Sequence, residues 1–144
     1  MKRAYTVSLY NQQERLDRLY GHNHWKDIDA NTESMDYKKE TAEDNYINFL
    51  KELCGTLNIE QANIERFEDT NSVHPKFKRM KMLTSTDFFF LIRECLRNNC
   101  RGKFVTKAFS IDAGYDDNIY LNSNTILKNF FTLVSKHHLY FQEY

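Results

Sequence analysis

The sequence predicts an α+β fold in which three or four helices pack on a mostly antiparallel sheet. Two observations lead to this class. Short stretches alternate apolar and polar residues with a period of two, whereas longer stretches carry apolar residues at helical spacing. The two kinds of stretch are intermixed along the chain, without the regular alternation of parallel α/β proteins. We expect one domain over residues 1–144, because a chain of this length can bury roughly two thirds of its unfolded surface.

Strand-like stretches occur in several parts of the chain. Residues 4–10 alternate and are rich in β-branched and aromatic side chains, which favour strands. Residues 76–82 also alternate, so we expect a strand there, although Pro75 would equally suit the start of a helix. Residues 103–121 predict one β-hairpin, with a strand over 104–111, a turn rich in Asp and Gly, and a short return strand. Residues 139–144 predict a last strand.

The helices are predicted from apolar stripes and from capping residues. The clearest covers residues 40–57, with a cap at Thr41 and an end at Gly55, after a polar loop over 22–40. A second covers 84–99, is capped by Thr84 or Ser85, and is apolar around most of its circumference. A short helix is expected at 11–20 and a last helix at 122–138, the latter capped by Ser123 or Asn124. Residues 58–69 fit neither period well.

Composition restricts the environment that we expect for the protein. No stretch approaches the roughly 20 apolar residues of a membrane span, and polar residues soon interrupt the apolar start of the chain. The three cysteines are expected to be free thiols of a cytoplasmic, soluble protein. Cys54 and Cys95 fall on apolar helix faces, whereas Cys100 follows a helix end and is expected at the surface.

Charge is unevenly distributed although the net charge is zero. Residues 27–70 hold twelve acids and four bases, whereas residues 71–107 hold nine bases and two acids. Two interpretations follow. The two segments lie together in the fold and neutralise each other, or one of them faces a charged partner and steers its approach.

His22 and His24 form the first candidate site, beside the single tryptophan. Residues two apart point the same way on a strand, so the pair could ligate one metal ion. Zinc needs three or four ligands, and none of the other His, Cys or Asp residues lies at a recognised spacing. We therefore favour a polar loop and expect no cofactor, with a metal at His22 and His24 as the alternative.

Catalysis is not the favoured function. A histidine and a carboxylate, such as His24 and Asp27, could exchange protons, but the sequence has no nucleophile elbow and no Gly-rich phosphate loop. The acids of the predicted hairpin turn, Asp112, Asp116 and Asp117, do not have the spacing of a calcium loop.

A basic stretch indicates nucleic-acid binding as the alternative function, through a binder or a small metal-dependent nuclease. Lys76, Lys78, Arg79 and Lys81 lie within six residues, and Phe77 among them is a candidate for stacking on a base. Arg93, Arg97, Arg101 and Lys103 would extend this patch. The neutral overall charge argues against it, because nucleic-acid-binding domains are usually strongly basic.

The function that we predict is binding of another protein, in the manner of an inhibitor, antitoxin or immunity protein. The acidic segment around residues 41–54 would cover a basic cleft on an enzyme or toxin by charge and shape. The predicted contact residues are two tyrosines and the acids beside them: Asp36, Tyr37, Glu40, Glu43, Asp44 and Tyr46. The identity of the partner is not encoded in any motif.

Overall fold

The computed structural model describes residues 3–8, 34–70, 75–114, 118–125, 127 and 129–143, and for residues 34–41 the description covers the helical backbone. In chain order the elements are β1 (Arg3–Ser8), α3 (Ser34–Thr56), β2 (Gln61–Glu68), the 3₁₀ helix η1 (Pro75–Arg79), β3 (Met82–Thr84), α4 (Ser85–Leu96), β4 (Arg101–Val105), β5 (Ser110–Ala113), β6 (Ile119–Ser123), α5 (Phe130–Lys136) and β7 (Tyr140–Glu143).

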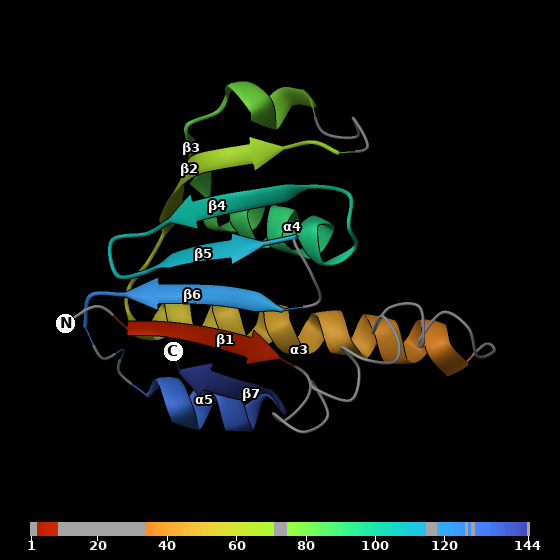
Figure 1. Cartoon of the computed structure of the whole chain (residues 1–144), viewed down its shortest axis with the longest axis vertical. Coiled ribbons are helices and arrows are strands. Elements are labelled where there is room, and N and C mark those ends of the chain that lie inside the picture. The colour runs from red at the N-terminus through yellow and green to blue at the C-terminus, as the bar shows by residue number, and fades with distance from the viewer. Residues whose placement is uncertain are drawn as a thin grey trace.

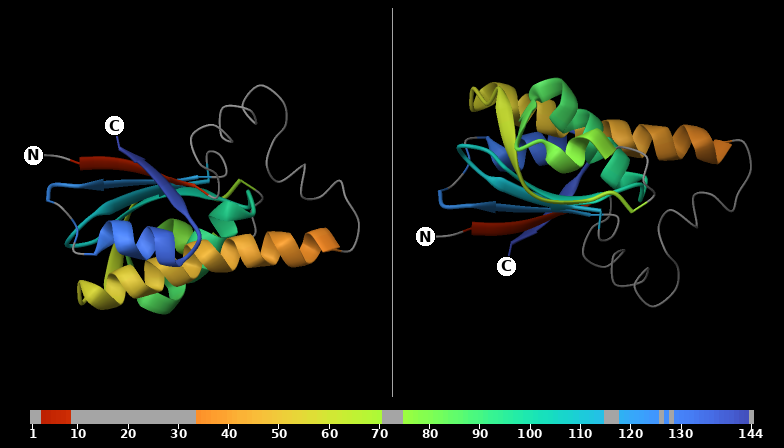
Figure 2. Two further views of the ribbon diagram at one scale, coloured as in Figure 1. Left: turned by 90° about the horizontal axis from the view of Figure 1, so that it is seen from below. Right: turned by 90° about the horizontal axis from the view of Figure 1, so that it is seen from above.

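The strands form one seven-stranded sheet in the order β3-β2-β4-β5-β6-β1-β7 (Figure 1). Every pair of neighbours is antiparallel. The helices α3, α4 and α5 lie on the same face of the sheet (Figure 2), so the described part of the molecule has two layers. The predicted α+β class with a mostly antiparallel sheet is therefore confirmed.

The core fills the space between the sheet and the helices. Strand residues that point toward the helices are buried and alternate with outward residues, as in β4, where Gly102 and Phe104 are buried and Arg101 is exposed. The rings of Phe88 on α4 and Phe104 on β4 lie 5.8 Å apart. Next to the β7 edge of the sheet, Phe130 of α5 lies 4.5 Å from Tyr5 of β1, measured between ring centroids.

Several predicted elements are confirmed. Helix α4, predicted over residues 84–99, begins after its cap Thr84, whose hydroxyl accepts a hydrogen bond from the backbone N–H of Asp87. The first and last predicted strands correspond to β1 and β7. Within the described part of the chain, no helix is long and apolar enough to cross a membrane.

The predicted boundaries of two helices are wrong. Helix α3 begins at Ser34, so residues 34–40 are helical and Thr41 lies inside the helix instead of capping it. The helix also continues through Gly55 to Thr56, and the chain leaves it at Asn58 with a φ of 56°. The last helix is shorter than predicted, because it begins at Phe130 instead of near residue 123.

The predicted hairpin over residues 103–121 is also wrong in outline, because three strands cover this region. A turn divides the predicted strand over 104–111 into β4 and β5. The hydroxyl of Thr106 closes this turn by accepting hydrogen bonds from the backbone N–H groups of Ala108 and Phe109. β5 ends at Ala113, and the next residue is Gly114, whose φ of 99° and close approach to the carbonyl of Cys100 exclude a side chain.

Residues 58–82 differ from the prediction at two places. The ambiguous stretch forms β2, in which a bulge between Ile64 and Arg66 shifts the register against β4. The expected strand after Pro75 is replaced by η1, as the alternative at Pro75 suggests, and β3 begins at Met82. The helix predicted over 11–20 and most of the loop predicted over 22–40 lie outside the described residues.

Candidate functional site

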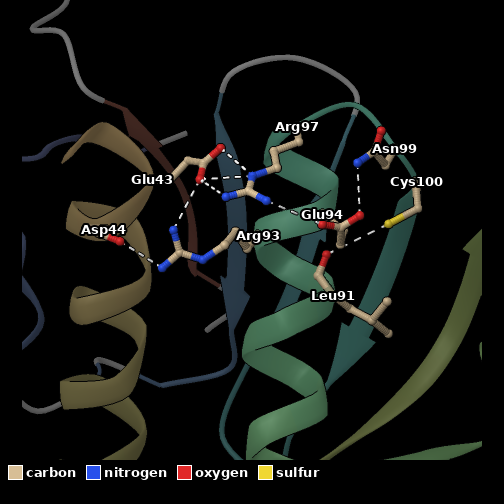
Figure 3. Close-up of polar contacts among 8 residues, drawn as sticks. All are labelled: Glu43, Asp44, Leu91, Arg93, Glu94, Arg97, Asn99 and Cys100. Atoms are coloured by element: carbon tan, nitrogen blue, oxygen red, sulfur yellow. Dashed lines mark hydrogen bonds and ion pairs between the residues drawn. The ribbon is translucent and has the colours of Figure 1, made fainter. Parts of the chain in front are cut away.

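Two acids of α3 face two arginines of α4 (Figure 3). The carboxylate of Glu43 accepts hydrogen bonds from Nε and Nη2 of Arg97 at 2.9 Å each and from Nη1 of Arg93 at 3.1 Å. Asp44 accepts one from Nη2 of Arg93 at 2.8 Å. Arg93 and Arg97 are one helical turn apart, so both reach the same stretch of the neighbouring helix.

These contacts remove Glu43 from the surface. Only 2% of Glu43 is exposed, whereas the side chain of Asp44 is 47% exposed. A buried carboxylate is tolerated when charged donors surround it, and Arg93 and Arg97 supply those donors. The interpretation that the acidic and basic segments neutralise each other is therefore confirmed for these four residues.

The predicted contact residues of the acidic segment thus fall into three groups. Glu43 and Tyr46 are buried, and Tyr46 belongs to the core. Asp44 is half-exposed and ion-paired. The side chains of Asp36, Tyr37 and Glu40 lie outside the described part of the chain, although their backbone belongs to α3. A role of this segment in partner binding stays a prediction.

The basic stretch is arranged differently. Lys76, Lys78, Arg79 and Lys81, here called the basic segment, are all exposed. Within the part of the chain that the structure describes, none of the four takes part in an ion pair, and Lys76 lies 4.7 Å from the centre of the Phe77 ring. Among the described residues, the basic segment is therefore a group of exposed cations without a neutralising acid.

A single aromatic side chain anchors this segment. Phe77 is 1% exposed, and its ring lies 6.4 Å from that of Phe67 on β2 and 6.2 Å from that of Phe90 on α4. The tight turn of η1 directs Phe77 into the core and leaves the flanking cations outside. The prediction that Phe77 stacks on a base is therefore wrong, because the ring is not accessible.

Three of the four other bases predicted for the patch are paired with acids, whereas Arg101 is exposed. Arg93 and Arg97 are committed to α3, and Nζ of Lys103 lies 3.2 Å from Glu65. Two large apolar side chains near the basic segment are exposed instead: Met82, which follows Lys81, at 52%, and Phe90, which touches Phe77, at 42%. Exposed apolar area therefore lies beside the basic segment.

Most residues predicted for metal or proton chemistry lie outside the described part of the chain. These are His22 and His24, together with Asp27, Asp116 and Asp117. The described residues hold no group of three or more His, Cys, Asp or Glu side chains that could bind a metal ion. The remaining hairpin acid, Asp112, pairs with Arg66 at 2.9 Å. A metal at His22 and His24 stays an untested alternative.

An open groove of about 440 Å³ lies beside the β4–β5 turn. Its lining is mostly polar and includes Asn58, Glu60, Gln61, Asn63, Thr106 and Lys107. The Thr106 hydroxyl in this lining belongs to the β4–β5 turn, where it donates a hydrogen bond to the carbonyl of Phe109 at 2.9 Å.

The cysteines give a finding that sequence reasoning missed. Cys54 and Cys95 are buried as predicted, but Cys100, expected at the surface, is also fully buried. Its sulfur lies 3.3 Å from that of Cys95. Burial raises the pKa of the Cys54 thiol to about 12. The hydrogen bond with Cys100, followed by burial, raises the pKa of Cys95 well above its usual value.

Comparison with known proteins gives no relative for this chain: no family model, no curated protein and no solved structure matches it.

Proposed function

We propose that the protein is a binding domain for another protein, and that it uses the basic segment, Lys76, Lys78, Arg79 and Lys81, as its contact surface. The observation that carries this proposal is the exposure of all four cations without an ion-pair partner among the described residues. The acids of α3 whose side chains are described are buried, paired or both.

A protein partner with an acidic surface suits this patch better than a nucleic acid does. Exposed Met82 and Phe90 add apolar area beside the cations, and Met, aromatic residues and Arg are enriched at protein interfaces. The buried ring of Phe77 removes the stacking contact that single-stranded nucleic acids would use. Nucleic acid remains the second candidate, since phosphates also attract such a cluster of cations.

An inhibitor or immunity-type role is compatible with this proposal. Such a protein would cover an acidic surface of its target through the basic segment, and electrostatic attraction would accelerate the encounter. The alternative surface is the acidic side of α3, where Asp36, Tyr37 and Glu40 would cover a basic enzyme or toxin.

The experiment compares two variants of equal charge. In the test variant, Lys78→Glu is combined with Arg79→Glu; in the control, Lys51→Glu is combined with Lys107→Glu, two exposed positions outside the basic segment. Each protein is immobilised and exposed to nuclease-treated lysate of the source cells, and the bound proteins are identified by mass spectrometry. We expect one protein that the wild type and the control retain and that the test variant loses by about tenfold or more.

Other outcomes separate the alternatives. Equal retention by all three proteins would contradict the basic segment as the contact surface. In that case Asp36→Lys with Glu40→Lys tests the acidic surface of α3. Binding of a labelled DNA duplex that falls steeply with salt and is lost in the test variant would favour nucleic acid instead.

A further inference from the structure

Cys95 and Cys100 meet where the chain turns from α4 into β4. Cys95 lies in the last turn of α4, and Asn98 takes a φ of 63° just after the helix ends. The N–H of Asn98 donates to the carbonyl of Cys95 at 3.0 Å, and the N–H of Asn99 donates to that of Glu94 at 3.0 Å. These hydrogen bonds reverse the chain, so Cys100 returns against the helix immediately before β4 begins.

The two sulfurs are held facing each other inside the protein. Both residues are 0% exposed, and their Sγ atoms are 3.3 Å apart. Sγ of Cys100 also lies 3.8 Å from the carbonyl of Leu91, one turn earlier in α4 (Figure 3). A disulfide has an S–S distance of about 2.05 Å, so the sulfurs need to approach by only about 1 Å.

We infer that Cys95 and Cys100 form a modification site that closes to an intramolecular disulfide when the protein meets a peroxide. The first thiol attacks one oxygen of hydrogen peroxide, the O–O bond breaks, and a sulfenic acid and one water are formed. The second thiol then attacks the sulfenic sulfur, the S–O bond breaks, and the hydroxyl leaves as a second water. Two thiols are oxidised and one peroxide is reduced to two waters.

The surroundings make this reaction slow but selective. The raised pKa of Cys95 keeps its thiol protonated at neutral pH, and burial requires the corner to open before peroxide can enter. Once one sulfur is oxidised, the nearest thiol is 3.3 Å away, so the second step is intramolecular. Cys54 is also buried, but it lies in α3 and not in the turn between α4 and β4.

Trypsin gives a direct test, because Arg97 lies between the two cysteines. Cleavage after Arg93, Arg97 and Arg101 yields the peptides 94–97 and 98–101, each with one of the two cysteines. The folded wild-type protein is treated with hydrogen peroxide, its remaining thiols are alkylated under denaturing conditions, and the digest is analysed without reduction. We expect the two peptides joined by a disulfide and two hydrogen atoms lighter than the separate thiols, while peptide 52–66 carries alkylated Cys54.

The digest uses only the wild-type protein, so its result does not depend on whether a variant folds. Alkylated Cys95 and Cys100 after prolonged oxidation would overturn the inference, as would links to Cys54 or between two chains. A second experiment measures the melting temperature before and after oxidation. Oxidation should raise it by several degrees in the wild type and in Cys54→Ser but not in Cys100→Ser, because the disulfide restricts the unfolded chain.

Discussion

At the scale of single residues, Glu43 shows how a predicted surface residue becomes part of the interior. The carboxylate is 2% exposed and receives four hydrogen bonds, three of them from Arg97. Its desolvation cost is offset because the donors are themselves charged. Replacing the carboxylate by an amide would keep only one acceptor oxygen and would place an N–H donor against the facing guanidinium groups.

We therefore expect Glu43→Gln to destabilise the protein by about 2 kcal/mol, because hydrogen bonds to charged groups contribute roughly 1.5–3 kcal/mol. The matched control is Asp44→Asn, which also removes a carboxylate facing Arg93. Its half-exposed ion pair should contribute less than about 0.5 kcal/mol. Urea denaturation of both variants gives the two free energies of unfolding. Equal losses would mean that burial of Glu43 is not decisive.

At the scale of elements, the sequence predicts those helices, strands and turns whose formation depends on neighbouring residues. Helix α4 is recognisable because Thr84 supplies a cap and a dense apolar stripe follows. The β4–β5 turn is not, because residues 104–111 contain no Gly, Pro, Asn or Asp. Thr106 substitutes for such residues by accepting hydrogen bonds from the turn backbone.

Strand β2 was ambiguous for a different reason. Ala62 and Ile64 are two residues apart, but the next inward residue, Phe67, follows after three. The bulge between Ile64 and Arg66 inserts the extra residue and breaks the period of two. Because the spacing of the inward residues is not constant, it matches neither the period of a strand nor that of a helix.

The candidate site was less predictable than the fold. The basic segment was visible in the sequence, but the burial of Phe77 depends on Phe67 and Phe90, which belong to other elements. Likewise, no local signal tells which acid Arg93 and Arg97 will meet. Pairing between α3 and α4 follows from the packing of the helices on the sheet, which one sequence does not fix.

The ion pairs that link α3 to the end of α5 predict that the stability of the protein depends on pH. Glu52 of α3 lies 2.5 Å from Nζ of Lys136 and 2.5 Å from Nε2 of His137 at the end of α5. Hydrogen bonds from Lys136 and then His137 lower the pKa of Glu52 below its usual 4.5. A lowered pKa means that the stabilisation is complete above pH 4.5 and is lost as the pH falls through the lowered value.

We expect the melting temperature of the wild type to exceed that of Glu52→Gln at neutral pH, and the difference to shrink as the pH falls below about 4.5. Thermal unfolding of both proteins between pH 7 and 3 measures it, and the subtraction removes the titration of other acids. A difference that is constant over this range would show that the charge of Glu52 does not hold α5 against α3.

At the scale of the whole molecule, the sheet order predicts a gradient of protection. β4 and β5 lie in the middle of the sheet, with paired strands on both sides, whereas β3 and β7 are its edges. Amides that pair on both sides open only when larger parts of the fold open. We therefore expect the slowest hydrogen exchange in β4 and β5 and faster exchange at the outward edges of β3 and β7.

Mass-spectrometric hydrogen exchange with peptide resolution measures this gradient. Tyr140 and Phe141 of β7 are 46% and 41% exposed, so this edge of the described sheet presents accessible aromatic rings. Exchange in β7 as slow as in β5 would contradict the gradient. Repeating the measurement at several protein concentrations then shows whether association protects the edge.

The place of β1 in the sheet has a consequence for biosynthesis. β1 lies between β6 and β7, so both of its neighbours come from the opposite end of the described sequence. A ribosome translates β1 before all other described strands and both of its neighbours after nearly all of them. β1 therefore waits unpaired while α3, β2, α4, β4 and β5 emerge, and its half of the sheet assembles only when translation is nearly finished.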